Sequence, residues 1–318
     1  MSKFLNVAIA LCVGAAALLT IAGLLADWYP PFDIVNNGLP YLSAGCLVLF
    51  FASFFARARR LTFAAGFLAA FNSAMLLQSL PGAAHEAAAG SERFLRVATA
   101  NLWRQNDGID EVAAFLIETD ADVVVFQETT RAHLAMLLLA LNARYPYRLG
   151  DSGLVILSKH RIVSDGRLER PGYPEWISLM TRWAKLDVNG TEVEFAGIHL
   201  AGPFYPALQA QDIATLAEFV RSRTGPLIVA GDFNMSPWTV KLTDFTKGTG
   251  LKRYNTILPS WPLYLRGIPF LPLVPIDNIF TSPQFTAIDT GTGPRIGSDH
   301  APIIADIALS EPVSAATK

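Results

Sequence analysis

Charged side chains are scarce in this sequence, and they are scarcest near the amino terminus. Asp, Glu, Lys and Arg make up 16% of the 318 residues, against about 25% in an average soluble protein. Residues 1–93 hold five basic and four acidic side chains, so the other 225 residues hold 20 basic and 23 acidic ones. A chain of this length has room for two units, and the uneven composition predicts two unlike ones.

The larger part also lacks a basic excess and lacks cysteine. Its formal charge is near −3, whereas a protein that binds duplex DNA usually has a basic face. The average can hide a local basic patch, so DNA binding is disfavoured without being excluded. The two cysteines, Cys12 and Cys46, both fall in apolar runs near the amino terminus. The larger part therefore has no disulfide framework and no thiolate metal site, which suits an oxidising compartment.

Three long uncharged runs occupy the first eighty residues, at about 4–26, 38–56 and 61–80. Each is long enough for a helix that crosses a bilayer. The first run could instead be a cleaved signal peptide, since Lys3 precedes it and small residues end it. The third could be a buried core helix, because it contains Asn72. Three runs in succession favour a membrane domain over residues 1–80 with three transmembrane helices.

A basic turn, Arg57-Ala-Arg-Arg60, separates the second run from the third. The positive-inside rule keeps such a turn in the cytoplasm. The third helix then carries the rest of the chain to the periplasmic or extracellular side of a bacterial inner (plasma) membrane, as part of a multi-pass protein. Residues 81–93 have the composition of a short flexible linker, and residues 311–318 form a C-terminal tail.

Residues 94–310 alternate between short apolar runs and stretches with helical periodicity. Helices are predicted at 108–118, 130–143 and 206–221, and strands at 94–100, 122–127, 153–157, 183–188, 192–198, 276–281 and 302–307. This mixture of elements predicts two sheets packed face to face with helices outside.

The stretch Leu227–Trp238, LIVAGDFNMSPW, is the most informative part of this region. Its apolar start predicts a buried strand, and period-two alternation then directs Asp232 and Asn234 to the same side. Active sites of layered α/β folds collect at such strand ends. An Asx-rich turn that closes a hairpin is the alternative. Ser236-Pro237 predicts the start of a helix, with serine as its N-cap.

Further polar clusters end other apolar runs. In chain order the motifs are N-L-W at Asn101, Q-E at Glu128, G-x-H-L at His199, G-D-F-N at Asp232, I-D-x-I-F at Asp277, and S-D-H at Asp299 and His300. Together they resemble the endonuclease/exonuclease/phosphatase superfamily, the fold of DNase I, exonuclease III and neutral sphingomyelinases. The resemblance runs from about residue 96 to 307, two thirds of the chain. It implies a four-layer α/β sandwich, DNase I-like, with two packed mixed β-sheets flanked by helices.

Phosphoester hydrolysis requires neutralisation of charge on the phosphate and an oriented water. Glu128 is the best candidate for a Mg²⁺ ligand, because a hard cation prefers carboxylate oxygen; Mn²⁺ is the alternative metal. Glu128 could instead be an exposed residue at a helix start. The resemblance implies that Asn101 supports the metal and that Asp299 lies near it.

The resemblance also implies the catalytic roles. Asp232 would orient or deprotonate the attacking water, and Asn234 would donate to the phosphate. His300 would contact the scissile phosphate while Asp277 holds its other ring nitrogen. His199 matches a second histidine of the DNase I and sphingomyelinase branches, although a lone histidine on an apolar strand is more often a core residue.

The substrate contacts are less clear. Asn278 stands where many relatives carry His or Tyr, and no residue matches the phosphate-binding tyrosine of the family. Arg182 is a candidate phosphate contact, with an ordinary surface charge as the alternative. The apolar, proline-rich stretch 261–275 is either a rigid loop or a membrane-touching lip beside the active site.

These features predict a membrane-anchored, Mg²⁺-dependent phosphoester hydrolase, phosphodiesterase or phosphatase, that acts outside the cytoplasm. The lipid bilayer and a lipid-linked or small phosphoester are its expected partners; nucleic acid is less favoured, and the sequence indicates no protein partner. An extracytoplasmic endonuclease or exonuclease is the first alternative. A catalytically silent anchored scaffold is the second alternative. The presence of all five residues Glu128, Asp232, Asn234, Asp277 and His300 argues against it, because a binding scaffold has no need for the complete set.

Overall fold

A computed structural model describes residues 2–78, 91–170, 172–173, 179–254, 257–265 and 267–310. The chain divides into two compact units. The first contains residues 1–80 together with 203–207 and 236–244, and the second contains 81–202, 208–235 and 245–318. Most of the predicted linker and the whole of the C-terminal tail lie outside the described residues.

The first unit is built from three long helices, α1 (Ser2–Leu24), α3 (Leu39–Phe55) and α4 (Arg59–Gln78), with two short ones, η1 (Pro30–Phe32) and α2 (Asp33–Asn36). The helices α1 and α4 are each long and apolar enough to cross a membrane. The helix α3 has 17 residues and reaches that length only when counted with Pro30–Asn36, from which it is bent by 61°. Of the three expected transmembrane helices, two are therefore long and apolar enough by themselves to cross a membrane.

Small and polar side chains join these helices. Ile9, Ala16, Cys46, Ala65 and Leu68 belong to one buried cluster. Beside it, the Asn72 side-chain amide donates to Thr20 Oγ1 at 3.0 Å and to Leu68 O at 2.9 Å. The bond to Thr20 joins α4 to α1, whereas the bond to Leu68 O lies within α4. Hydrogen bonds between helices, such as the first, are typical of membrane helix bundles.

Within the same unit, the Asp33 carboxylate accepts hydrogen bonds from the amides of Val240 and Lys241 at 2.9 and 3.2 Å. These amides belong to the first turn of α9 (Val240–Thr249). The prediction that this helix starts at Ser236-Pro237 is therefore wrong. Residues 236–239 form a turn in which Thr239 donates to Ser236 O. Thr239 Oγ1 accepts from the Leu242 amide at 3.4 Å, so Thr239 caps the helix instead of Ser236, and Asp33 accepts from the two amides before it.

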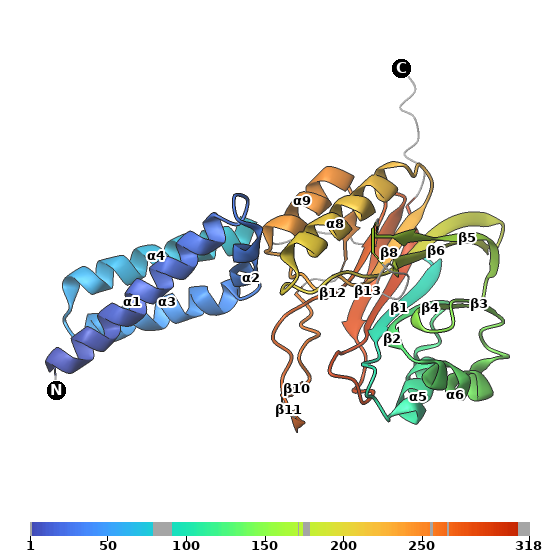
Figure 1. Cartoon of the computed structure of the whole chain (residues 1–318), viewed down its shortest axis with the longest axis horizontal. Coiled ribbons are helices and arrows are strands. Elements are labelled where there is room, and N and C mark those ends of the chain that lie inside the picture. The colour runs from blue at the N-terminus through green and yellow to red at the C-terminus, as the bar shows by residue number, and fades with distance from the viewer. Residues whose placement is uncertain are drawn as a thin grey trace, which may run out of the picture. The chain divides into compact units, whose positions relative to one another are not determined.

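The second unit contains two six-stranded sheets (Figure 1). The first sheet has the order β13-β14-β1-β2-β4-β3, with strands Phe285–Thr292, Ile303–Leu309, Leu95–Asn101, Val123–Thr129, Gly153–Ser158 and Tyr147–Leu149. The second has the order β5-β6-β7-β8-β12-β9, with strands Arg161–Glu169, Leu179–Val188, Thr191–His199, Leu227–Asp232, Asp277–Thr281 and Lys252–Arg253. A separate hairpin joins β10 (Tyr264–Leu265) to β11 (Ile268–Pro269).

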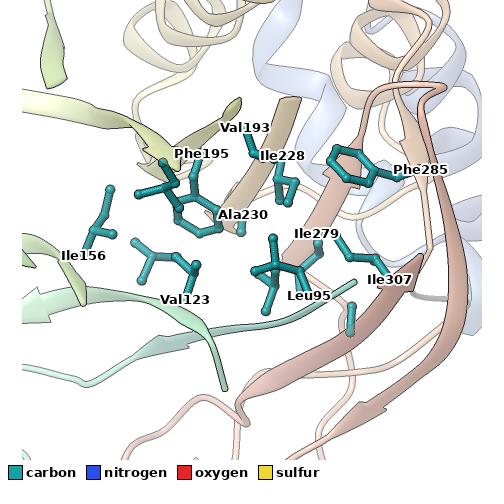
Figure 2. Close-up of a cluster of buried hydrophobic side chains, with 14 of the residues drawn as sticks. Leu95, Val123, Ile156, Val193, Phe195, Ile228, Ala230, Ile279, Phe285 and Ile307 are labelled. Carbon is teal, nitrogen blue, oxygen red and sulfur yellow. The ribbon is translucent and has the colours of Figure 1, made fainter. Parts of the chain in front are cut away.

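The inner faces of the two sheets form one hydrophobic core, shown in Figure 2. Leu95 and Val123 come from the first sheet, and Phe195 and Ile228 come from the second; all four are fully buried. The sheets approach so closely that a Cβ on Gly197 would lie 2.4 Å from Val125 Cγ2. This close packing aligns the strand ends of the two sheets.

Helices cover the two outer faces, as Figure 1 shows. On the first sheet, α5 (Ile109–Thr119) and α6 (Arg131–Leu141) share a buried cluster with the outward-facing residues of β1, β2 and β4. On the second, Phe219 of α8 (Pro206–Arg221) packs on Trp183, and Phe245 of α9 packs on Phe280. The unit is therefore the four-layer α/β sandwich that was predicted.

Six strands of the described residues were not predicted: β3, β5, β9, β10, β11 and β13. The nine residues of β5, RIVSDGRLE, are half-buried or exposed and do not alternate between apolar and polar. The strand exists because β6 pairs with it along its length, and pairing of this kind leaves no local pattern in the sequence.

Candidate active site

The strand β8 places Asp232 at the centre of a cluster of polar side chains. In the second sheet, Asp232 is opposite His199 of the parallel strand β7 and opposite Asp277 of the antiparallel strand β12. Gly231 precedes it with a φ of 149°, and a Cβ there would lie 2.1 Å from Ile198 O. Only glycine allows β7 and β8 to approach in this way. The glycine of the G-D pair is therefore required by the backbone, whereas the aspartate supplies the chemistry.

The first sheet contributes Asn101 and Glu128 from the ends of β1 and β2. The register of β2 is irregular between Phe126 and Thr129, and Glu128 has a φ of 54°. Backbone of this kind is costly for a residue other than glycine and clusters at functional sites. The Asn101 side-chain amide donates to Glu128 Oε1 at 3.3 Å and to Asp232 Oδ2 at 3.1 Å. It therefore links the site residues of the two sheets.

The S-D-H motif follows in the loop before β14. His300 Nδ1 lies 2.8 Å from Asp277 Oδ2, and both side chains are buried. Asp299 accepts a hydrogen bond from Trp261 Nε1 at 3.1 Å. His199 completes the cluster, since its Nε2 lies 3.7 Å from Asp232 Oδ2. The cluster thus brings together Asn101, Glu128, His199, Asp232, Asp277 and His300, with Asp299 beside His300 in the chain.

Asn234 holds the loop that follows β8. It has a φ of 52°, a left-handed conformation that asparagine tolerates better than most residues. Its backbone amide donates to Asp232 Oδ1 at 2.8 Å, and its side-chain amide donates to Leu200 O at 2.9 Å. In this arrangement Asn234 orients the Asp232 carboxylate. This role is additional to the predicted one, in which Asn234 donates a hydrogen bond to the phosphate.

Ser298 is a site residue to which the sequence analysis gave no role. Its buried hydroxyl donates to Asn101 O at 2.6 Å and accepts from the His300 amide at 3.1 Å. Ser298 therefore fixes the histidine loop to the end of β1. In the sequence, the only indication that Ser298 belongs to the site was its place as the first residue of the S-D-H motif.

Two predicted substrate contacts are placed elsewhere. Asn278 is fully buried, accepts a hydrogen bond from Arg253 Nη1 at 3.5 Å and donates to Pro275 O at 3.5 Å. Because successive residues of a strand face opposite sides, it points away from the face that carries Asp277. Arg182 donates from Nε to Leu154 O at 2.9 Å. These contacts give both residues structural roles and do not support their direct contact with substrate.

Burial and charge separate the pKa values of the acidic and basic groups. Desolvation, reinforced by the charge of Asp277, raises the pKa of Asp232 to about 7. Burial lowers the pKa of His300, but the carboxylates of Asp277, Asp232 and Asp299 outweigh it and raise the pKa to about 10. Burial lowers the pKa of His199. At neutral pH His300 is therefore cationic, and Asp232 titrates. Groups whose environments separate their pKa values in this way can act as acid and base.

The donor set fits a divalent cation. Asp232, Asp277 and His300 have ligand atoms that all lie within 4.8 Å of one another, but His300 Nδ1 is already hydrogen-bonded to Asp277. Glu128 is half-buried and accepts hydrogen bonds only from neutral groups, Asn101 and the Arg104 amide, among the contacts of the described residues. None of the ion pairs of the described residues involves this carboxylate, and oxygen donors of this type suit Mg²⁺ or Mn²⁺.

The comparisons with known proteins agree with this site. The model of the Endonuclease/Exonuclease/phosphatase family matches residues 98–300, so the chain belongs to that family. Its members are phosphoester hydrolases and generally depend on a divalent metal. The chain is accordingly a metal-dependent hydrolase of phosphoester bonds, and the scaffold alternative is not supported. No curated protein matches the chain.

Several solved structures share the fold. A family member from Bacteroides thetaiotaomicron is 20% identical, with a TM-score of 0.57 over 68% of this chain and 95% of its own. A mannosyl-6-phosphatase from the same organism is 18% identical, with a TM-score of 0.53 over 68% and 100%. A humanized TDP2 from D. rerio is 15% identical, with a TM-score of 0.55 over 68% and 99%. At these identities the likeness concerns the fold of the second unit.

Proposed function

We propose that the protein is a membrane-anchored, Mg²⁺-dependent hydrolase that acts outside the cytoplasm on a lipid-linked or small phosphoester. One observation supports the chemistry above all: Asp232, with its raised pKa, lies within a single cluster with the His300–Asp277 pair and the carboxylate Glu128. This set supplies a base, a cationic donor and a metal ligand.

The residues divide the chemistry as follows. Asp232 takes the proton of the attacking water, and Asn234 and Asn101 hold its carboxylate in place. His300 donates from Nε2 to a phosphate oxygen, while Asp277 holds Nδ1 and keeps the ring protonated. His199 borders the same space. Glu128, with Asn101 and Asp299 nearby, would hold the cation, which neutralises charge on the phosphate when it is bound.

An apolar surface beside the site supports a lipid-linked substrate. In the stretch 261–275, Ile268 and Leu271 are 68% and 76% exposed. Arg295 holds this stretch through hydrogen bonds to Leu263 O at 2.8 Å and Phe270 O at 2.5 Å. The Trp261–Asp299 bond joins its base to the candidate metal site. Exposed apolar patches of this kind mark contact with apolar partners, and the acyl chains of a lipid substrate are such a partner.

The helices α1 and α4 support the membrane anchor. The basic turn at Arg57–Arg60 favours the cytoplasm for the α3–α4 connection, which leaves the connection after α4 on the opposite side. The proposed location of the catalytic unit is therefore the periplasmic or extracellular side of the inner (plasma) membrane.

The test offers three substrates to the detergent-purified full-length protein in Mg²⁺: mixed phospholipid vesicles, a water-soluble aryl phosphate ester and plasmid DNA. Asp232→Asn is the inactive variant, and Asp165→Asn, on the exposed strand β5, is the matched control. Release of headgroup or phosphate from vesicles or from the soluble ester supports the proposal. Cleavage of DNA alone overturns the proposed substrate class in favour of a nuclease.

A further inference from the structure

A hollow of about 1020 Å³ lies where α3 turns into α4, far along the chain from the cluster around Asp232. Phenylalanines of both helices line it, among them Phe54, Phe63 and Phe67, together with Arg57 and Arg59 of the turn. Phe63 is 79% exposed. The hollow therefore combines aromatic walls with two cationic groups.

The backbone of the turn makes Arg57 an unusual choice of residue. Ala58 N donates to Ser53 O at 2.9 Å and Arg57 N donates to Phe54 O at 3.0 Å, while Arg57 has a φ of 57°. This is a Schellman motif, and glycine is the residue that suits its left-handed position. Arginine is therefore conformationally less favourable than glycine at this position, and it places a guanidinium group at the turn.

The charge of the turn is not neutralised by this part of the chain. In residues 2–78 the acidic side chains are Asp27 and Asp33. Asp33 is engaged by Lys241 at 3.3 Å and by the amides of α9. Among the ion pairs of the described residues none involves Arg57, Arg59 or Arg60. Three positive charges therefore remain at one end of two apolar helices, one of which is long enough to cross a membrane.

We propose that this hollow binds one anionic phospholipid of the surrounding leaflet. Its phosphate contacts Arg57 and Arg59, and an acyl chain lies along Phe54, Phe63 and Phe67. Basic pockets at the ends of membrane helices recognise anionic headgroups in this way, and guanidinium groups match the geometry of phosphate oxygens. The inference rests on the proposed membrane anchor and is independent of the hydrolytic reaction.

Gly66 accounts for the shape of the hollow. A Cβ at this position would lie 3.0 Å from Phe50 Cδ2, a distance that forces the ring of Phe50 to move. Gly66 thus lets Phe50 pack directly on α4 and form part of the wall. A larger side chain at position 66 would occupy the space assigned to the acyl chain.

The experiment measures lipid binding to the full chain by native mass spectrometry. The protein carries Asp232→Asn, so that no lipid is hydrolysed, and is titrated with phosphatidylglycerol or with phosphatidylcholine of the same chain length. We expect phosphatidylglycerol to bind at least about tenfold more tightly, because phosphatidylcholine carries the same phosphate together with a choline ammonium that the two arginines repel. Equal binding of the two lipids would overturn the proposal.

The variants separate charge from folding. Arg57→Gly keeps the left-handed backbone and removes the guanidinium, and together with Arg59→Gln it should abolish the preference for phosphatidylglycerol. Arg131→Gln, which removes an exposed arginine of α6, is the control and should retain it. Gly66→Leu should weaken both lipids alike. An unchanged preference in the double variant would contradict the assignment.

The same proteins distinguish this inference from the proposed function. Reconstitution into lipid nanodiscs tests the anchor; failure to incorporate overturns both the anchor and the lipid site. If the chain incorporates and the version with Asp232 hydrolyses its substrate, but no preference for phosphatidylglycerol is found, only the lipid site is wrong.

Discussion

Each unit of the molecule buries a group of polar side chains, and the two groups differ in charge. Between the long helices of the first unit the group is neutral: Asn72 contacts Thr20, and Ser43 contacts Ser73 at 2.7 Å. In the second unit it is ionisable and centred on Asp232, Asp277 and His300. The comparison shows that buried polar side chains can have two different roles. A satisfied neutral group holds helices together, whereas buried ionisable groups keep pKa values that serve chemistry.

The largest expected effect is that of Asp232→Asn, which removes the base and leaves the shape of the cluster. We expect kcat to fall by at least about 10³-fold, within the range for loss of an acid–base group. Because burial penalises the ionised carboxylate, thermal stability near pH 7 should be unchanged or higher. Activity assays and thermal unfolding check both points, with Asp165→Asn as the control. A loss of activity that is accompanied by unfolding would contradict this account.

Removal of the metal should have the next largest effect. A chelator should abolish activity, and added Mg²⁺ or Mn²⁺ should restore it, since carboxylate oxygens dominate the donor set. Glu128→Gln should raise the Mg²⁺ concentration for half-maximal activity by about tenfold or more. Glu118→Gln, in the last turn of α5, is a matched control. A metal requirement that Glu128→Gln leaves unchanged would exclude Glu128 as a ligand.

The Asp277→Asn variant should shift the pH dependence. The charge and hydrogen bond of Asp277 raise the pKa of His300 to about 10, so kcat/KM of the unmodified enzyme should fall only as the pH approaches 10. In the variant this alkaline limb should move toward the ordinary histidine range near 6.5. The pH–rate profile measures the shift, and an alkaline limb that stays in place would assign it to another group.

Stability should follow the same titration. A histidine whose pKa is raised in the folded state stabilises the fold at pH values below its unfolded pKa of about 6.5, and this contribution is lost as the pH rises through 10. Denaturant unfolding of Asp277→Asn should therefore differ from that of the unmodified protein more at pH 6 than at pH 10.

The smallest expected effect comes from the neutral group. Asn72→Leu removes the contacts with Thr20 and Leu68 O. Hydrogen bonds between membrane helices contribute about 0.6 kcal/mol on average, so the free energy of unfolding in detergent should fall by less than about 2 kcal/mol, and kcat should not change. A large loss of activity in this variant would show that the two polar groups are coupled.

Much of the second unit was predictable, because its strands are continuous apolar runs and its helices are amphipathic. The helix at 206–221 was predicted with the bounds that α8 has. The strand β5 escaped prediction because its exposed residues carry no alternating pattern. The start of α9 was predicted three residues too early, because Ser236 and Thr239 are both suitable caps and only the structure shows that Thr239 takes this role, with Asp33 as a distant second acceptor.

The candidate site shows the same division. Asp232, His300, Glu128 and Asn101 were predictable, since each ends an apolar strand within a short motif. The buried contacts of Asn278 with Arg253 and Pro275 were not, although its place next to Asp277 on one strand already directs it to the opposite face. The hydroxyl of Ser298 gained its role only when the loop before β14 met the end of β1.

The sequence by itself determined the apolar helices, the strands and the order of the motifs, because hydrophobic periodicity and short motifs are local properties of the chain. Only the tertiary structure decided which side chains meet and what their pKa values become. Asn101 and Asp232 are 131 residues apart and share a hydrogen bond, and Asp277 changes the pKa of both Asp232 and His300. Burial and electrostatic interaction depend on the distances between groups in space, and these distances are set only when the two sheets pack together.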